Sequence, residues 1–153
     1  MSTMIIVLGI GLHSGCKSTS TPTDAFDRLA KAGEAGDLAT FLGGLTQDSA
    51  DAFDGLLAVS GTEHAKKLRL GGLGTAVRAI SAQTPGQQDL ALVLVETTDS
   101  PPQRAQVLMR LEDGDWKLDL ISTELLWNRN WELSGGSPKR GAWYEINPST
   151  IMQ

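Results

Sequence analysis

Residues 104–122 read RAQVLMRLEDGDWKLDLIS, and this stretch decides the fold. Apolar and polar residues alternate on both sides of Asp113-Gly114, a dipeptide that favours a two-residue hairpin turn. Closing the turn separates two sets of cross-strand pairs, and a slip of one residue would mix them. One face carries the pairs Leu111–Trp116, Met109–Leu118, Val107–Leu120 and Ala105–Ser122. The other face carries Glu112–Asp115, Arg110–Lys117, Leu108–Asp119 and Gln106–Ile121.

A further strand is predicted just before this hairpin. Residues Leu90 to Val95 read LALVLV, a continuous apolar run that is typical of a strand covered on both faces. TDSPPQ, residues 98–103, is the expected loop between this strand and the hairpin.

Helical spacing dominates the chain before these strands. Asp24 can cap a first helix that is broken by GEAGD, Gly33 to Asp37, and apolar residues resume helical spacing from Leu38. Another helix is predicted from Asp48 or Ser49 to Gly61. Two short helices are predicted over Thr62–Leu70 and Thr75–Ala82.

Helices followed by an antiparallel sheet predict an α+β domain over residues 24–126, with the helices packed on a curved sheet of three to four strands. The stretches AFDRLAKAGEAGDLATFLGGLT and RAQVLMRLEDGDWKLDLIS together resemble nuclear-transport-factor-2-like domains. The resemblance implies a cone-shaped, cystatin-like arrangement whose concave sheet encloses a pocket in many relatives. It also implies that enzymes with this fold place an Asp, His or Tyr in that pocket.

Few side chains are candidates for such chemistry. Glu96, Arg110 and Asp119 could meet on the polar face of the sheet, where a cross-strand salt bridge explains them equally well. His64 lies in TEHAKK and is expected on an exposed helix face. We find no cluster with metal-ligand spacing and no dinucleotide loop, so the sequence indicates neither a metal nor a cofactor. The net charge of −5 argues against a nucleic-acid partner.

The end of the chain, residues 127–153, has an unusual composition. It holds three of the four tryptophans and the only tyrosine. We expect this aromatic extension to fold back on the domain. The alternative is an exposed patch for a protein or small-molecule partner, because Trp and Tyr are enriched at binding hot spots. The residues concerned are Trp127, Trp131, Trp143 and Tyr144.

The start of the chain predicts where the protein is located. Residues 4–12, MIIVLGIGL, are uncharged and suit the central part of a signal peptide spanning residues 1–15. Small residues then precede Cys16, and residues 17–23, KSTSTPT, read as a flexible tether. This order resembles the lipobox of bacterial lipoproteins, which implies that Cys16 is acylated and that residues 16–23 link membrane lipid to the domain. Lys17 is not the Asp that retains some lipoproteins in the inner membrane, which favours the outer one.

Two hypotheses of function follow. The first is a membrane-anchored lipoprotein of the cell envelope whose domain binds a partner or small ligand without catalysis. The second is a pocket-type lyase or isomerase, as some members of the resembled superfamily are. An enzyme requires a buried, pocket-facing titratable residue.

Overall fold

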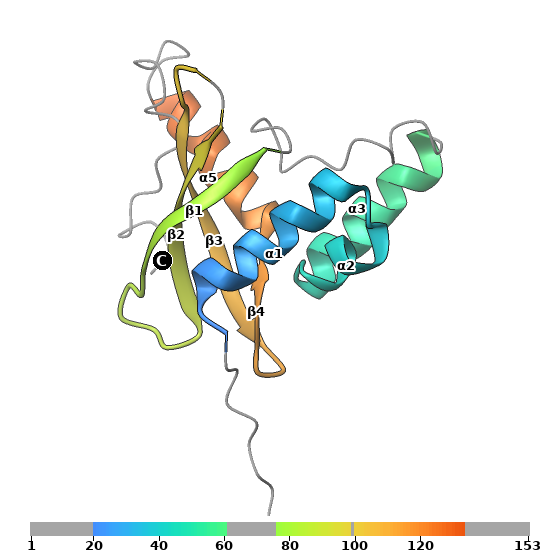
Figure 1. Ribbon diagram of the computed structural model, residues 1–153, viewed down its shortest axis with the longest axis horizontal. Helices are drawn as coiled ribbons and strands as arrows, with labels where there is room; N and C mark the ends of the chain where they lie inside the picture. Colours follow the sequence, from blue (N-terminus) through green and yellow to red (C-terminus); the bar gives the residue numbers. More distant parts are fainter. Residues whose placement is uncertain (1–19, 61–75, 99, 134–153) are drawn as a thin grey trace, which may run out of the picture.

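A computed structural model describes residues 20–60, 76–98 and 100–133 of the chain. It has helices followed by a curved four-stranded antiparallel sheet, which confirms the predicted α+β class (Figure 1). The helices before the sheet are α1 (Pro22–Ala35), α2 (Leu38–Gly43) and α3 (Gln47–Ser60). The strands are β1 (Val77–Gln83), β2 (Leu90–Thr97), β3 (Arg104–Glu112) and β4 (Asp115–Leu118), and helix α5 (Leu120–Leu133) follows them.

The hairpin forms in the predicted register and is shorter than predicted. Its turn at Asp113-Gly114 joins β3 to β4, and Met109 pairs with Leu118 as expected. The β3–β4 pairing ends at Met109 and Leu118, where the chain turns into α5, so four predicted pairs were wrong. These were Leu108–Asp119, Val107–Leu120, Gln106–Ile121 and Ala105–Ser122. The physical reason is a helix cap, because the Asp119 Oδ1 atom accepts a hydrogen bond from the Ser122 backbone N–H at 2.9 Å.

The edge strand β1 replaces a predicted helix. Residues 75–82 were expected to be helical, but Val77–Gln83 pairs antiparallel with β2, with Arg78 opposite Glu96 and Ala82 opposite Val93. Pairing with β2 outweighs the local helical spacing, as is common for short segments. The predicted helix Thr62–Leu70 lies outside the described residues.

Helix α1 ends and the cap of α2 lies within the segment GEAGD, where the sequence predicts an interruption. Thr21, rather than Asp24, is the N-cap of α1, and the Asp24 carboxylate bonds back to the Thr21 N–H in a capping box. Helix α1 ends at Gly36, whose φ of 71° suits a residue without a side chain. Asp37 then caps α2 through a hydrogen bond from the Thr40 N–H at 3.1 Å.

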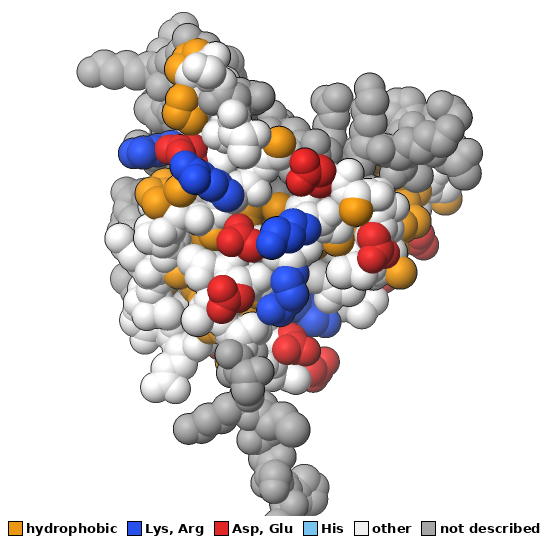
Figure 2. All heavy atoms as spheres, in the orientation of Figure 1, with side chains coloured by type: hydrophobic (Ala, Val, Ile, Leu, Met, Phe, Trp, Pro, Cys, Tyr) orange, Lys and Arg blue, Asp and Glu red, His pale blue; other side chains and the backbone are white. Residues whose placement is uncertain are grey.

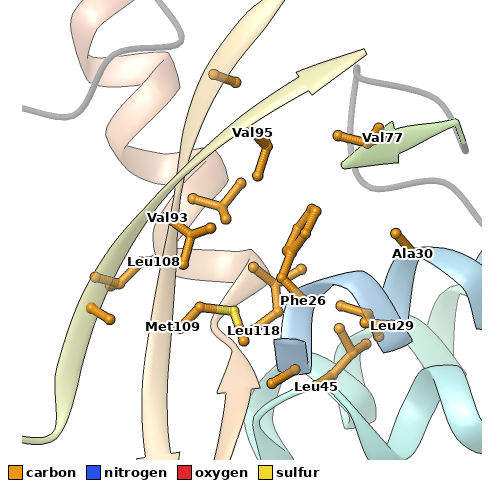
Figure 3. Close-up of a cluster of buried hydrophobic side chains, with 14 of the residues drawn as sticks. Phe26, Leu29, Ala30, Leu45, Val77, Val93, Val95, Leu108, Met109 and Leu118 are labelled. Carbon is orange, nitrogen blue, oxygen red and sulfur yellow. The ribbon is translucent and has the colours of Figure 1, made fainter. Parts of the chain in front are cut away.

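The main core lies between α1 and one face of the sheet. Figure 3 shows Phe26 and Leu29 of α1 directed toward side chains of the strands, among them Met109 and Leu118. Leu92 and Leu108 lie on the other face of the sheet and are also buried. Strand β2 is therefore covered on both faces, as its uninterrupted apolar run predicts.

A close approach of two segments fixes how the helices meet β4. The Leu118 N–H donates to the Gly44 carbonyl at 2.8 Å, and the Thr46 N–H donates to the Leu118 carbonyl at 3.0 Å. A Cβ atom on Gly44 would lie 2.7 Å from the Leu29 Cδ1 atom, and Leu29 is itself buried. Gly44 is therefore required for space rather than for its backbone angles, since its φ is −87°.

We expect Gly44→Ala to lower the free energy of unfolding by about 1–3 kcal/mol, as overpacked core positions do. Gly43→Ala is the matched control, because nothing lies within 4 Å of a Cβ atom there. That control should leave stability unchanged or raise it by up to about 1 kcal/mol. Urea unfolding of both variants measures the difference, and equal effects would contradict the packing argument.

Candidate functional site

Strand β3 is longer than its neighbour β4, and helix α5 lies along the part that β4 leaves unpaired. The Asp119 N–H donates to the Leu108 carbonyl at 2.9 Å, and the Thr123 Oγ1 atom accepts from the Leu108 N–H at 3.0 Å. One turn further, the Trp127 indole N–H donates to the Gln106 carbonyl at 2.8 Å. Thr123 and Trp127 are both buried. Helix α5 therefore closes the edge of the sheet through side chains.

The first turn of α5 is held by a residue from a distant part of the sequence. The Ser49 Oγ atom, on α3, accepts hydrogen bonds from the backbone N–H groups of Leu120 at 3.1 Å and Ile121 at 3.3 Å. The Thr46 hydroxyl donates to the same Ser49 oxygen at 2.8 Å. Ser49 and Thr46 are buried, so these bonds satisfy groups that water does not reach.

An ionic ladder of Arg78, Glu96 and Arg104 crosses the polar face of the sheet. The three residues sit directly opposite one another on β1, β2 and β3. The Glu96 carboxylate accepts from Arg104 Nε at 2.8 Å and from Arg78 at 2.9 Å. Its side chain is 9% exposed, whereas those of Arg78 and Arg104 are 64% and 67% exposed. Hydrogen bonds from Arg104 and then Arg78 hold the pKa of Glu96 below its usual range.

A second ion pair lies on the same face, toward the other end of β3. The Arg110 guanidinium bonds to the Asp119 carboxylate, which also caps α5. Of the three residues that the sequence suggested could meet, Arg110 and Asp119 form a salt bridge, and Glu96 does not join them. Arg110 is six residues from Arg104, which corresponds to about 20 Å along a strand. Glu96 therefore takes its partners from the opposite end of the sheet.

The ion pairs decide what these carboxylates can do. Glu96 is shared by two guanidinium groups, and Asp119 is divided between Arg110 and the cap of α5. Both side chains are thus already engaged, and the bonds to Glu96 favour its ionised form, which suits a structural role better than proton transfer near neutral pH. Within the described residues, no group of His, Cys, Asp or Glu side chains has the arrangement of a metal site.

The aromatic candidates fall in different places. Trp127 is a buried residue of α5, with its indole bound to β3. Trp131 lies on the same helix one turn later, and its side chain is not among those described. Trp143, Tyr144, His64 and Cys16 lie outside the described residues.

The roles of three residues that hold the sheet and α5 together were not predicted from the sequence. Arg78 was assigned to a helix, which hid its position opposite Glu96. Ser49 was considered only as a possible helix start, and nothing local indicates a contact 71 residues away. Thr123 was placed beyond the hairpin, although its position four residues before Trp127 would fit one helix face.

Comparison of the chain with protein-family models, with curated proteins and with solved structures gave no match. Among the helices of the described segments, none is long and apolar enough to cross a bilayer.

We expect Glu96→Gln to reduce the dependence of stability on pH. A carboxyl group whose pKa is lowered by folding stabilises the protein above its unfolded pKa, about 4.3 for Glu. That contribution is lost as the pH falls through the lower, folded pKa. Melting temperatures between pH 7 and pH 3 should therefore fall more steeply for the wild-type chain than for the variant.

Glu34→Gln controls for the loss of one carboxylate, because Glu34 is exposed and makes no ion pair with another described residue. Parallel pH profiles for wild type and Glu96→Gln would contradict the role of the ladder.

We expect Trp127→Ala to destabilise the protein by about 3–5 kcal/mol, because it empties a buried aromatic position. Trp127→Phe leaves a smaller aromatic ring and removes the N–H donor, so it should cost more than the roughly 0.5–1.5 kcal/mol of one hydrogen bond and less than Trp127→Ala. Leu125→Ala, on the same helix and 63% exposed, should change stability by less than about 0.5 kcal/mol. Urea unfolding measures the stability of the three variants. A loss of stability for Leu125→Ala as large as for Trp127→Ala would contradict the assignment of the buried face of α5.

Proposed function

We propose that this protein is a lipid-anchored protein of the cell envelope whose α+β domain binds a partner without catalysing a reaction. One observation carries the proposal, namely the order of segments at the start of the chain. An uncharged apolar run at residues 4–12 precedes Cys16, a polar stretch at residues 17–20 follows it, and Thr21 then caps the first helix. A lipidated cysteine requires this order.

The capped helix start makes the proposed anchor a short one. Four residues lie between Cys16 and Thr21, and the five steps from one Cα atom to the next span at most about 18 Å when fully extended. An acylated Cys16 would therefore keep the domain close to the bilayer surface. A single acyl chain binds a membrane weakly and reversibly, so lasting attachment needs the several chains that lipoproteins carry.

Binding is favoured over catalysis by the state of the polar side chains. Pocket lyases and isomerases need an acid or base that is free to exchange a proton with a substrate. Glu96 and Asp119, the two buried carboxylates described, are both committed to arginine partners. The space between α1 and the sheet is filled by Phe26 and its neighbours, as Figure 3 shows.

The charges on the visible surface do not favour a nucleic-acid partner. Figure 2 shows positive and negative side chains interspersed over the face that carries α1 and β1. Among the described residues on this face, charges of one sign form no block that would attract a phosphate backbone, and the net charge of the chain is −5. Lys17 after the cysteine favours the outer membrane as the site of attachment.

The proposal predicts that Cys16→Ser abolishes lipidation. In bacteria fed an alkyne-bearing fatty acid, the wild-type chain should carry the label and sediment with membranes. The variant should carry no label, and should either be released from the membrane fraction or remain there unprocessed. Ser18→Ala, two residues into the polar stretch, is the matched control and should behave as wild type. Labelling and processing of the Cys16→Ser chain would sink the anchor proposal.

A further inference from the structure

The ionic ladder carries more positive charge than its own carboxylate neutralises. Arg78 and Arg104 contribute two positive charges, and Glu96, which both of them bind, contributes one negative charge, so the three side chains together carry a net charge of +1. The other ion pair of this face, Arg110 with Asp119, is neutral as a pair. The ladder therefore presents a surplus positive charge that attracts anions from solution.

Both guanidinium groups of the ladder are held in place while they stay open to water. Arg78 donates from Nη2 and Arg104 from Nε, each to one oxygen of the Glu96 carboxylate. The two groups thus converge on one buried side chain, although both arginine side chains are mostly exposed. A guanidinium group has several N–H donors, so each arginine keeps donors that its bond to Glu96 does not use. Because their positions are already fixed, a ligand that binds them loses less entropy in ordering them.

A second row of side chains lies beside the ladder. Ser81, Leu94 and Gln106 are directly opposite one another on β1, β2 and β3. Leu94 is two residues before Glu96, so the two rows share one face of the sheet and lie about 7 Å apart. Ser81 is exposed and Leu94 is half-buried. The guanidinium groups therefore border a small apolar surface with a hydroxyl group beside it. We call this place the ladder site, and it consists of Arg78, Glu96, Arg104, Ser81 and Leu94.

The ladder site is on the face of the sheet away from α1. Glu96 follows Val95 on β2, and successive side chains of a strand point to opposite faces. Figure 3 shows Val95 on the side of Phe26, which belongs to α1. The site is also at the end of the sheet where β2 leads into β3, and Figure 1 shows this end opposite the start of α1. An anchor that precedes α1 would therefore hold the site away from the bilayer, where a soluble ligand reaches it more readily than a lipid phosphate.

We propose that the ladder site binds a carboxylate ligand that carries an apolar group next to its acid. A single negative charge neutralises the ladder, whereas a phosphate monoester, with about −1.5 to −2 charges, would leave excess negative charge beside Glu96. Arginine binds carboxylates through strong, directional N–H···O bonds. The apolar group of the ligand would lie on Leu94. The proposal rests on the binding role of the domain given above, for which it names the class of ligand, and it is independent of lipidation at Cys16.

The test titrates the full chain, labelled with 15N, in micelles of an uncharged detergent. The probe is N-acetyl-leucine, and N-acetyl-leucinamide is its neutral match. NMR follows the backbone N–H signal of Leu94 and the Nε–H signal of Arg104. Both signals should shift saturably with the acid, and the acid should bind at least about tenfold more tightly than the amide. N-acetyl-glycine should bind more weakly than N-acetyl-leucine, because it has no side chain to cover Leu94.

Substitutions locate the binding. Arg104→Gln should weaken the binding of N-acetyl-leucine at least about tenfold, measured at the Leu94 signal. Arg28→Gln is the matched control and should bind as wild type, because Arg28 is an exposed arginine of α1, on the other side of the sheet. If Arg104→Gln does not melt cooperatively, Arg104→Lys replaces it. That variant keeps the charge without the planar fork of donors, and it should also bind more weakly than the control.

Three results would overturn the proposal. One is equal binding of the acid and its amide. Another is an Arg104→Gln variant, or its Arg104→Lys replacement, that binds N-acetyl-leucine as tightly as Arg28→Gln does. The third is tighter binding of dimethyl phosphate than of N-acetyl-leucine, which would assign the site to a phosphodiester. Because binding is measured apart from lipid labelling and fractionation, a failed Cys16→Ser experiment leaves this test intact, and a failed titration leaves the anchor intact.

Discussion

A strand that is longer than its neighbour leaves backbone hydrogen-bonding groups without partners, and this constraint governs the structure. Strand β3 has nine residues and β4 has four. A buried backbone group without a hydrogen-bond partner costs about 1–3 kcal/mol. The part of β3 that β4 leaves unpaired therefore needs another partner. The chain provides it by turning at Asp119 into a helix that runs back along the same edge. The position of α5, the burial of Trp127 and the buried hydroxyl of Thr123 all follow from this solution.

The same turn joins the helical part of the protein to the sheet. Leu118 is hydrogen-bonded on both sides of its peptide unit to the segment between α2 and α3. Ser49 then supplies the acceptor for two N–H groups that a new helix always leaves free. The helices before the sheet are thus connected to the sheet and to α5 in two ways. Hydrogen bonds hold the segment between α2 and α3 to Leu118 and the start of α5, and apolar packing around Phe26 holds α1 on the sheet. Helices α3 and α5 share an anchored start and separate beyond it, as Figure 1 shows.

Local patterns predicted the parts of the fold that depend on local contacts. The β3–β4 turn and the continuous strand β2 were predicted correctly, because alternation, turn residues and apolar runs are properties of neighbouring residues. Strand β1 was missed because its stability comes from pairing Arg78 with Glu96, 18 residues away. The start of α5 was missed because its second cap, Ser49, is 71 residues distant. The ionic ladder was missed because it needs both the strand β1, which carries Arg78, and the register of β2 with β3, which places Arg104 opposite Glu96.

The way in which α5 closes β3 has a consequence for the behaviour of the protein in solution. The edge is covered by three side-chain or helix-end contacts rather than by a neighbouring strand, so it can open without disrupting the rest of the sheet. Release of α5 would uncover residues 104–108 of β3, the part that β4 leaves unpaired, and an unpaired strand edge that carries apolar residues promotes intermolecular β-pairing. Aggregation on heating would then begin from a nearly native molecule with a detached helix. The solubility of this protein would therefore depend on how firmly α5 is held against β3.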